Sequence, residues 1–188
     1  MLHFISASIL LALVLFVIIR VQIMKQKGID AFKFGVTNQR DFLIPPFALI
    51  YFYLILARAF GWPFPYGLEL PLPDSIGWLG IGLGCLGIAG LAISLISFKT
   101  SFRVGIDEKT RDALVTGGIF ALSRNPIYVS FALVLLGQLA VSCNAIFALY
   151  GVAGCWLFHR QVLQEEVFLR SHYGDAYLQY CQKVRRYL

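Results

Sequence analysis

Two apolar runs meet at Cys143 and Asn144 in the sequence PIYVSFALVLLGQLAVSCNAIFALYGVAGCWLF, residues 126–158, and their arrangement decides the fold. One continuous buried helix of this length would exceed the thickness of a bilayer. The polar pair therefore predicts a tight hairpin of two membrane-spanning helices, at residues 126–142 and 145–158. Both runs are at or below the lower limit of about 17 residues for a full crossing, so we expect short spans.

The rest of the chain also has the composition of a membrane protein. Hydrophobic residues make up 59% of its 188 residues and charged residues only 14%, and the mean hydropathy is +0.74. Three further apolar runs, residues 4–24, 42–60 and 76–98, match the roughly 20 residues that cross a bilayer as a helix. The first lacks the basic start and small-residue cleavage site of a signal peptide, so we expect it to remain as a span. The sequence thus predicts an all-α polytopic integral membrane protein with about five transmembrane helices.

Lysine and arginine residues outside these spans fall on one side of the membrane. They occur between the first and second spans, between the third and fourth, and after the fifth, whereas residues 61–75 contain none. Because cytoplasmic loops collect such residues, we expect the N-terminus outside and the C-terminus in the cytoplasm. A four-span or six-span arrangement would break this agreement.

The net charge of +6 is therefore an orientation signal, strengthened by attraction to membrane lipids with anionic headgroups. It does not call for nucleic-acid binding. The sequence shows no targeting motif, so we expect a prokaryotic inner membrane. It does not indicate an oligomeric state.

The chain divides into two functional parts. Residues 1–98 hold three expected spans for packing and substrate access, and their glycine-rich sequence at residues 77–84 suits close helix contacts. Residues 99–188 form the expected catalytic half. It contains a polar segment at residues 99–124 that is long enough for a reentrant or lid structure, then the hairpin. A cytoplasmic helix, a turn at Gly174 and a second, amphipathic helix against the membrane are expected to follow.

Polar residues stand at the expected mouths of the hairpin. Asn125 can cap the free amides of a helix, and Pro126 suits the first helical position. Glu165 and Glu166 follow the second hairpin helix where it should leave the bilayer. Because adjacent residues point to different faces of a helix, the two carboxylates should differ, and we expect Glu166 to lie on a solvated surface.

Cysteine and histidine residues form no recognisable ligand pattern. The four cysteines and three histidines are scattered without paired spacing. We therefore expect neither a disulfide framework nor a metal site.

Three blocks in the second half of the chain occur in a characteristic order. They are Leu114-Val115-Thr116-Gly117-Gly118, then Arg124-Asn125-Pro126-Ile127-Tyr128, then Glu165-Glu166 with Leu169, Tyr173-Gly174, Tyr177, Tyr180, Val184 and Arg185. In order and spacing they resemble the isoprenylcysteine carboxyl methyltransferase family and the related phospholipid methyltransferases. The resemblance covers about residues 99–186. The family usually has histidine at the position of Asn125, and many members have tyrosine at that of Phe120.

The resemblance implies an enzyme that transfers a methyl group from S-adenosylmethionine, leaving S-adenosylhomocysteine, to a lipophilic small-molecule or lipid-modified acceptor. Carboxyl methylation of a prenylcysteine-like substrate is the reaction it implies most directly. Such an in-line displacement needs no metal, and positioning can supply much of its rate. The implied cofactor pocket faces the cytoplasm, and its contacts are Leu114, Val115, Phe120, Arg124, Asn125, Pro126, Tyr128 and Glu165. Arg160 and Glu165 are the implied catalytic residues, Arg160 as the partner of the acceptor's carboxylate.

The residue types suit this cofactor. The aromatic faces of Tyr128 or Phe120 can contact a sulfonium by cation–π attraction. Glu165 can pair with the cofactor's amino group or accept hydrogen bonds from its ribose hydroxyls. The helix start at Pro126, with Arg124 beside it, can hold its carboxylate.

Structural alternatives stay open for several of these residues. Asn125 can be only a helix cap, Tyr128 can be an interface anchor, and Arg124 can simply follow the distribution of cytoplasmic charge. Tyr177 and Tyr180 suit membrane contact or packing better than ligand binding.

Two other functions also stay open. Membrane sterol and steroid reductases that use NADPH are similar in their C-terminal halves, with an asparagine- or histidine-containing block before a span. They usually have more spans, and the paired glutamates fit them less well. The second alternative is a non-catalytic packing subunit that keeps the fold without the chemistry.

Overall fold

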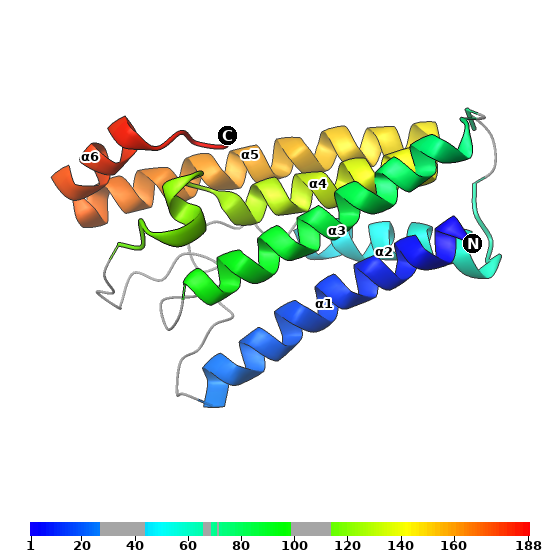
Figure 1. The fold of residues 1–188 in the computed structure, drawn as a ribbon, viewed down its shortest axis with the longest axis horizontal. Helices are drawn as coiled ribbons and strands as arrows, with labels where there is room; N and C mark the ends of the chain where they lie inside the picture. The colour runs from blue at the N-terminus through cyan, green and yellow to red at the C-terminus, as the bar shows by residue number, and fades with distance from the viewer. Residues whose placement is uncertain (27–43, 66–68, 71, 99–113) are drawn as a thin grey trace.

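A computed structural model of the chain describes residues 1–26, 44–65, 69–70, 72–98 and 114–188 (Figure 1). Its elements are helices α1 (Leu2–Gln26), α2 (Ile44–Phe60) and α3 (Asp74–Ser97), the short 3₁₀ helix η2 (Gly118–Ala121), and helices α4 (Pro126–Val141), α5 (Ala145–Tyr173) and α6 (Asp175–Lys183).

Five apolar helices form the bundle, which confirms the predicted all-α polytopic membrane fold. α1, α3 and α5 are long and apolar enough to cross a bilayer, and α2 and α4 are shorter apolar helices. Their bounds follow the predicted runs within two residues, apart from the end of α5. In the ranges given above, an isolated bridge between Glu69 and Asn144 is the sole β contact.

The two ends of the bundle differ (Figure 1). The tail end, as we call it, carries η2, α6 and the C-terminus. The hairpin end carries the N-terminus, the start of α3 and the turn between α4 and α5. In that turn, the Asn144 side chain accepts a hydrogen bond from the Ile146 amide at 2.8 Å and caps α5. The predicted hairpin at Cys143 and Asn144 is confirmed.

Helices α3 and α4 approach each other backbone to backbone. A Cβ atom added at Gly80 would lie 2.5 Å from the Gly137 carbonyl oxygen, and one added at Gly137 would lie equally close to the Gly80 carbonyl. Further along, a Cβ at Gly87 would lie 2.7 Å from the Ser130 carbonyl oxygen. Lipid tails are as apolar as leucine, so helices in a bilayer associate mainly through such close van der Waals packing. The glycines therefore join these two spans.

A buried polar pair joins α1 to α4. The Ser6 hydroxyl donates to Gln138 Oε1, and Gln138 Nε2 donates to the Ser6 carbonyl at 3.1 Å. Both residues are at most 3% exposed. Each polar group satisfies the other in apolar surroundings, where an unpaired amide would be costly. The pair thus holds the first span to the second half of the chain.

Helix α5 combines the fifth predicted span with the cytoplasmic helix that was expected to follow it. The apolar run ends at residue 158, and the helix continues unbroken to Tyr173. The polar residues beyond 158 are good helix formers and extend α5 to about 43 Å, past a bilayer core of about 30 Å. Gly174, at φ 53°, then separates α5 from α6, which confirms the predicted turn.

Gly80→Ala is expected to weaken the packing of α3 on α4, because the new Cβ would require the Gly137 backbone to move. Such overpacking costs about 1–3 kcal/mol, partly offset by about 1 kcal/mol of helix propensity gained on replacing glycine. Thermal unfolding in detergent measures the balance. Gly82→Ala is the matched control, since nothing lies within 4 Å of its Cβ position, and it should be neutral or stabilising. Equal melting temperatures for the two variants would contradict the contact.

Candidate functional site

Tyr128 and Glu165 meet at the tail end, between the first turn of α4 and the outer part of α5. The Tyr128 hydroxyl donates to Glu165 Oε1 at 2.5 Å, and Gln161 Nε2 lies 3.4 Å from the same oxygen. The Tyr128 ring packs beside Phe158, with ring centroids 5.9 Å apart. The structure thus brings together two residues that the sequence assigned to one site.

Phe120 closes the tail end against α3. It is 5% exposed and packs edge-on against Phe98, with ring centroids 4.6 Å apart. Gly118 lets η2 approach α3 closely, because its φ is 63° and an added Cβ would lie 3.0 Å from Ser97 Oγ. The Phe120 carbonyl accepts a hydrogen bond from the Tyr180 hydroxyl at 2.5 Å. This bond ties η2 to α6.

The predicted lid at residues 99–124 is described only from residue 114 onward. Leu114 and Val115 are half-buried in irregular chain before η2. Residues 99–113 lie outside the described residues. The lid, and the cofactor pocket that it would help to form, stay predictions.

Asn125 precedes α4, but its side chain does not cap the helix. Asn125 Nδ2 instead donates to the Arg186 carbonyl at 3.1 Å, because the C-terminal segment folds back onto this position. The side-chain cap left open by the sequence is therefore contradicted. Pro126 occupies the start of α4 as predicted, and the Asn125 carbonyl accepts the Tyr128 amide at 3.1 Å.

Glu166 lies in an ion cluster with Arg124 and Arg186, so its predicted solvated position was wrong. Its side chain is 12% exposed. Arg186 Nε and Nη2 donate to its carboxylate at 3.1 and 2.8 Å, and Arg124 Nη2 lies 3.4 Å from Oε1. Hydrogen bonding to Glu166 raises the pKa of Arg186 above its ordinary value. Helix geometry alone could not reveal this role, because both partners are distant in the sequence.

The C-terminal segment completes the tail end. Its Arg185 carbonyl accepts the Arg124 amide at 3.0 Å, and the Arg124 guanidinium also donates to Cys181 Sγ. Tyr177 and Tyr180 are 1% and 8% exposed, so they are packing residues, as expected. Burial raises the pKa of Tyr180 to about 12.

The structure does not place the Arg160 side chain next to that of Glu165. The two residues are five positions apart on α5, so their side chains point roughly 140° apart around the helix. The Arg160 guanidinium lies over the Trp156 ring, 5.8 Å from its centroid, and Trp156 is 60% exposed. In this structure Arg160 therefore lies away from the Tyr128 and Glu165 pair.

Three residues at this site were missed by the sequence analysis. Gln161 could have been found, since it stands one helical turn before Glu165. The other two, Arg186 and Tyr187, lie in the basic C-terminal tail. Arg186 binds Glu166, and the Tyr187 hydroxyl lies 2.7 Å from His159 Nδ1. Their spacing in the sequence does not predict these partners.

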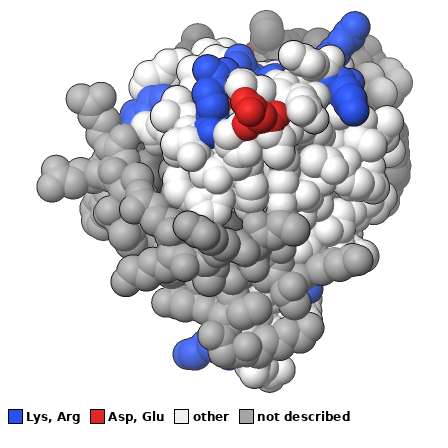
Figure 2. Space-filling model, turned by 90° about the vertical axis from the view of Figure 1, so that its left-hand side faces the viewer, with Lys and Arg blue, Asp and Glu red and all other residues white. Residues whose placement is uncertain are grey.

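Cation ligands do not gather in the described part of the chain. No group of three or more histidine, cysteine, aspartate or glutamate side chains there could hold a metal ion. Basic side chains do gather at the tail end, which Figure 2 shows face on. What the site offers chemically is a hydrogen-bonded carboxylate beside aromatic rings, next to an ion cluster of one glutamate and two arginines.

Comparison of the amino-acid sequence with known proteins shows which family it resembles. The sequence pattern of the family described as phospholipid methyltransferase matches residues 75–176. The chain is 34% identical over 107 residues to the protein-S-isoprenylcysteine O-methyltransferase of Schizosaccharomyces pombe, covering 55% of this chain and 45% of that protein. It is 32% identical over 89 residues to the protein-S-isoprenylcysteine O-methyltransferase A of Arabidopsis thaliana, covering 47% of this chain and 44% of that protein. The chain thus spans about half the length of the curated relatives it matches.

Glu166→Gln is expected to loosen the C-terminal segment, because Arg124 and Arg186 lose their shared anion. Losing a charged hydrogen-bond partner at a largely buried position should cost about 1–3 kcal/mol. Thermal unfolding, with limited proteolysis of the tail, measures the effect. Asp175→Asn, which removes an exposed carboxylate from the first turn of α6, is the control and should cost less than about 1 kcal/mol. If both variants behave alike, the cluster does not hold the tail.

Proposed function

The chain belongs to the phospholipid methyltransferase family, and on that premise we propose that it transfers a methyl group from S-adenosylmethionine to a lipophilic acceptor at the membrane interface. The observation that carries this proposal is the Tyr128 and Glu165 pair at the mouths of two membrane helices. A water-borne cofactor and an acceptor dissolved in the bilayer can both reach this level. Carboxyl methylation of a prenylcysteine-like acceptor is the specific reaction that we propose, because the relatives described above carry that activity in their names.

The residues present fit the proposed cofactor. When bound, S-adenosylmethionine would supply the methyl group, as a sulfonium electrophile for the acceptor's nucleophilic oxygen. The Glu165 carboxylate, oriented by Tyr128, suits an amino group or ribose hydroxyls. The half-buried Tyr128 ring is the aromatic face proposed for the sulfonium, whereas Phe120, packed against Phe98, would contribute only from the wall of the site. Leu114 and Val115, half-buried before η2, would supply apolar contacts.

In this proposal, Arg124 and Asn125 mainly hold the start of α4 in place. The guanidinium of Arg124 is held by Glu166 and Cys181, and the amide of Asn125 is held by the tail carbonyl of Arg186. These contacts fix the start of α4, where Pro126 leads into the turn that carries Tyr128. The positive end of the α4 dipole, with the Arg124 guanidinium beside it, would favour the cofactor's carboxylate at this helix start.

For the acceptor, we propose Arg160 as the partner of the carboxylate, which requires the Arg160 guanidinium to turn from the Trp156 ring toward the Tyr128 and Glu165 pair. The Arg160 side chain is half-buried against Trp156 and faces away from the tight packing of α4. An acceptor chain lying along α5 in the bilayer would reach this residue. Arg160 would then act on the acceptor rather than on the cofactor.

We also propose that the tail end faces the cytoplasm and the N-terminus faces outward. The described basic residues support this orientation, because they gather at the tail end (Figure 2). At the hairpin end, Arg58 is paired with Glu69 at 2.5 Å and adds no net positive charge. A prokaryotic inner membrane is the location that we propose.

Glu165→Gln is expected to weaken binding of S-adenosylhomocysteine by about tenfold or more, because a charged hydrogen bond worth about 1.5–3 kcal/mol is lost. Calorimetric titration of the detergent-purified protein measures it. Glu69→Gln, which removes a carboxylate at the hairpin end, is the control and should bind normally. Tyr128→Phe should weaken binding less, since the carboxylate remains.

Two results would count against the proposal. Unchanged affinity in Glu165→Gln would remove Glu165 from the site. Saturable binding of NADPH with no binding of S-adenosylhomocysteine would replace the methyltransferase with a reductase.

A further inference from the structure

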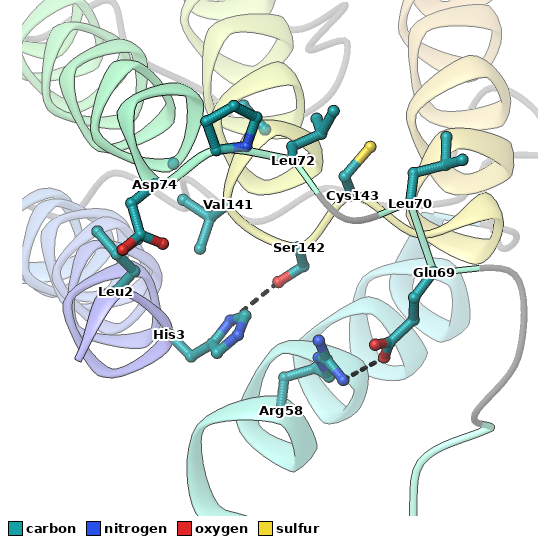
Figure 3. A pocket seen from close by; sticks show the side chains of 13 residues that line it. Leu2, His3, Arg58, Glu69, Leu70, Leu72, Asp74, Val141, Ser142 and Cys143 are labelled. Atoms are coloured by element: carbon teal, nitrogen blue, oxygen red, sulfur yellow. Dashed lines mark hydrogen bonds and ion pairs between the residues drawn. The ribbon is translucent and has the colours of Figure 1, made fainter.

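A pocket of about 240 Å³ opens at the hairpin end, on the opposite side of the bundle from Tyr128 and Glu165 (Figure 3). The ends of four helices and the chain before α3 form its wall. Its polar lining residues come from separate elements: His3, Arg58, Glu69, Asp74 and Ser142. The remaining lining is mostly apolar.

The charges in this pocket are mixed. Arg58 Nη1 donates to Glu69 Oε1 at 2.5 Å, which uses one of the five N–H donors of a guanidinium. His3 Nδ1 and Ser142 Oγ lie 3.1 Å apart. Asp74, in the first turn of α3, is exposed. Figure 3 shows its carboxylate on the side of the pocket away from the Arg58 and Glu69 pair.

These charges select the kind of ligand. A simple anion would bind Arg58 but leave the Asp74 carboxylate unmatched, and a simple cation would bind Asp74 but leave the unused donors of Arg58 unmatched. His3, Glu69 and Asp74 do not form a group that could hold a metal ion. A ligand with a positive group for Asp74 and a negative group for Arg58 satisfies both ends of the pocket.

The position of the pocket relative to the membrane surface indicates the source of such a ligand. Trp62 and Tyr53 stack beside the end of α2, with centroids 6.4 Å apart, and are 45% and 43% exposed. Exposed tryptophan and tyrosine are typical of the membrane–water interface. Leu70 and Leu72, which line the pocket, are 65% and 43% exposed. They provide an apolar rim on which acyl chains can lie.

We propose that this pocket binds the zwitterionic headgroup of a membrane phospholipid with a primary ammonium, of the phosphatidylethanolamine type. The ammonium binds Asp74 through its N–H donors, and the phosphate binds the unused donors of Arg58. The bound lipid is separate from the methyl acceptor, because the pocket lies at the other end of the bundle. The proposal therefore does not depend on the methyl-transfer site.

Native mass spectrometry of the delipidated full chain tests it, with phosphatidylethanolamine, phosphatidylcholine and phosphatidylglycerol of matched acyl chains. Phosphatidylethanolamine should bind about tenfold more tightly than the other two, since choline lacks N–H donors and glycerol lacks the positive charge. Asp74→Asn should bring phosphatidylethanolamine to within about twofold of phosphatidylcholine. Arg58→Gln should weaken both. Asp74 is exposed, so its variant is expected to fold even if the Arg58 variant does not.

Two control variants separate this pocket from the rest of the molecule. Glu165→Gln and Asp175→Asn, both at the tail end, should keep the full preference for phosphatidylethanolamine. Loss of that preference in Glu165→Gln would place the lipid at the methyl-transfer site and overturn the proposal. Equal binding of the three lipids, or an unchanged preference in Asp74→Asn, would overturn it too.

Soluble phosphoethanolamine tests whether the pocket binds this headgroup on a membrane lipid or as a free compound. It should bind at least tenfold more weakly than the lipid, because it cannot use the apolar rim. Binding as tight as that of the lipid would show that the pocket takes a free compound instead.

Discussion

The backbone contact between α3 and α4 is the constraint on which the rest of the structure depends. Gly80 and Gly137 let these spans touch without intervening side chains. The contact aligns the two helices along their length, so their ends meet at both membrane surfaces. At one surface, Phe98 at the end of α3 packs against Phe120, beside the start of α4. At the other, the start of α3 lies against the end of α4, and both line the pocket at the hairpin end.

At the tail end, adjacent carboxylates on α5 perform different tasks. Glu165 faces α4 and accepts the Tyr128 hydroxyl, whereas Glu166 faces the returning C-terminal segment and binds Arg186 and Arg124. A rotation of about 100° between neighbouring helical residues produces this division. One carboxylate thus binds Tyr128 at the proposed cofactor site, while the other holds the C-terminal segment. Asn125 belongs to the second group, since its amide binds the same segment.

Polar groups inside the bundle serve cohesion, and those at its ends include the residues of the two proposed binding sites. The Ser6 and Gln138 pair is nearly inaccessible and satisfies its own hydrogen bonds. At the two ends, carboxylates and arginines remain near the level of the lipid headgroups. This arrangement suits the proposed methyl transfer, because the proposed cofactor would come from water and the acceptor from the bilayer.

The sequence by itself determined the membrane class, the positions of the spans, the hairpin at Cys143 and Asn144 and the turn at Gly174. These features depend on local hydropathy, on residue periodicity and on glycine's access to positive φ. It also placed Tyr128 and Glu165 in one site, through the order of its motif blocks. Only the tertiary structure decided that Glu166 is an ion-cluster residue and that the amide of Asn125 binds the tail. Those outcomes depend on how the C-terminal segment folds back and how α5 is rotated against α4, and contacts between distant residues leave no periodic signal in a single sequence.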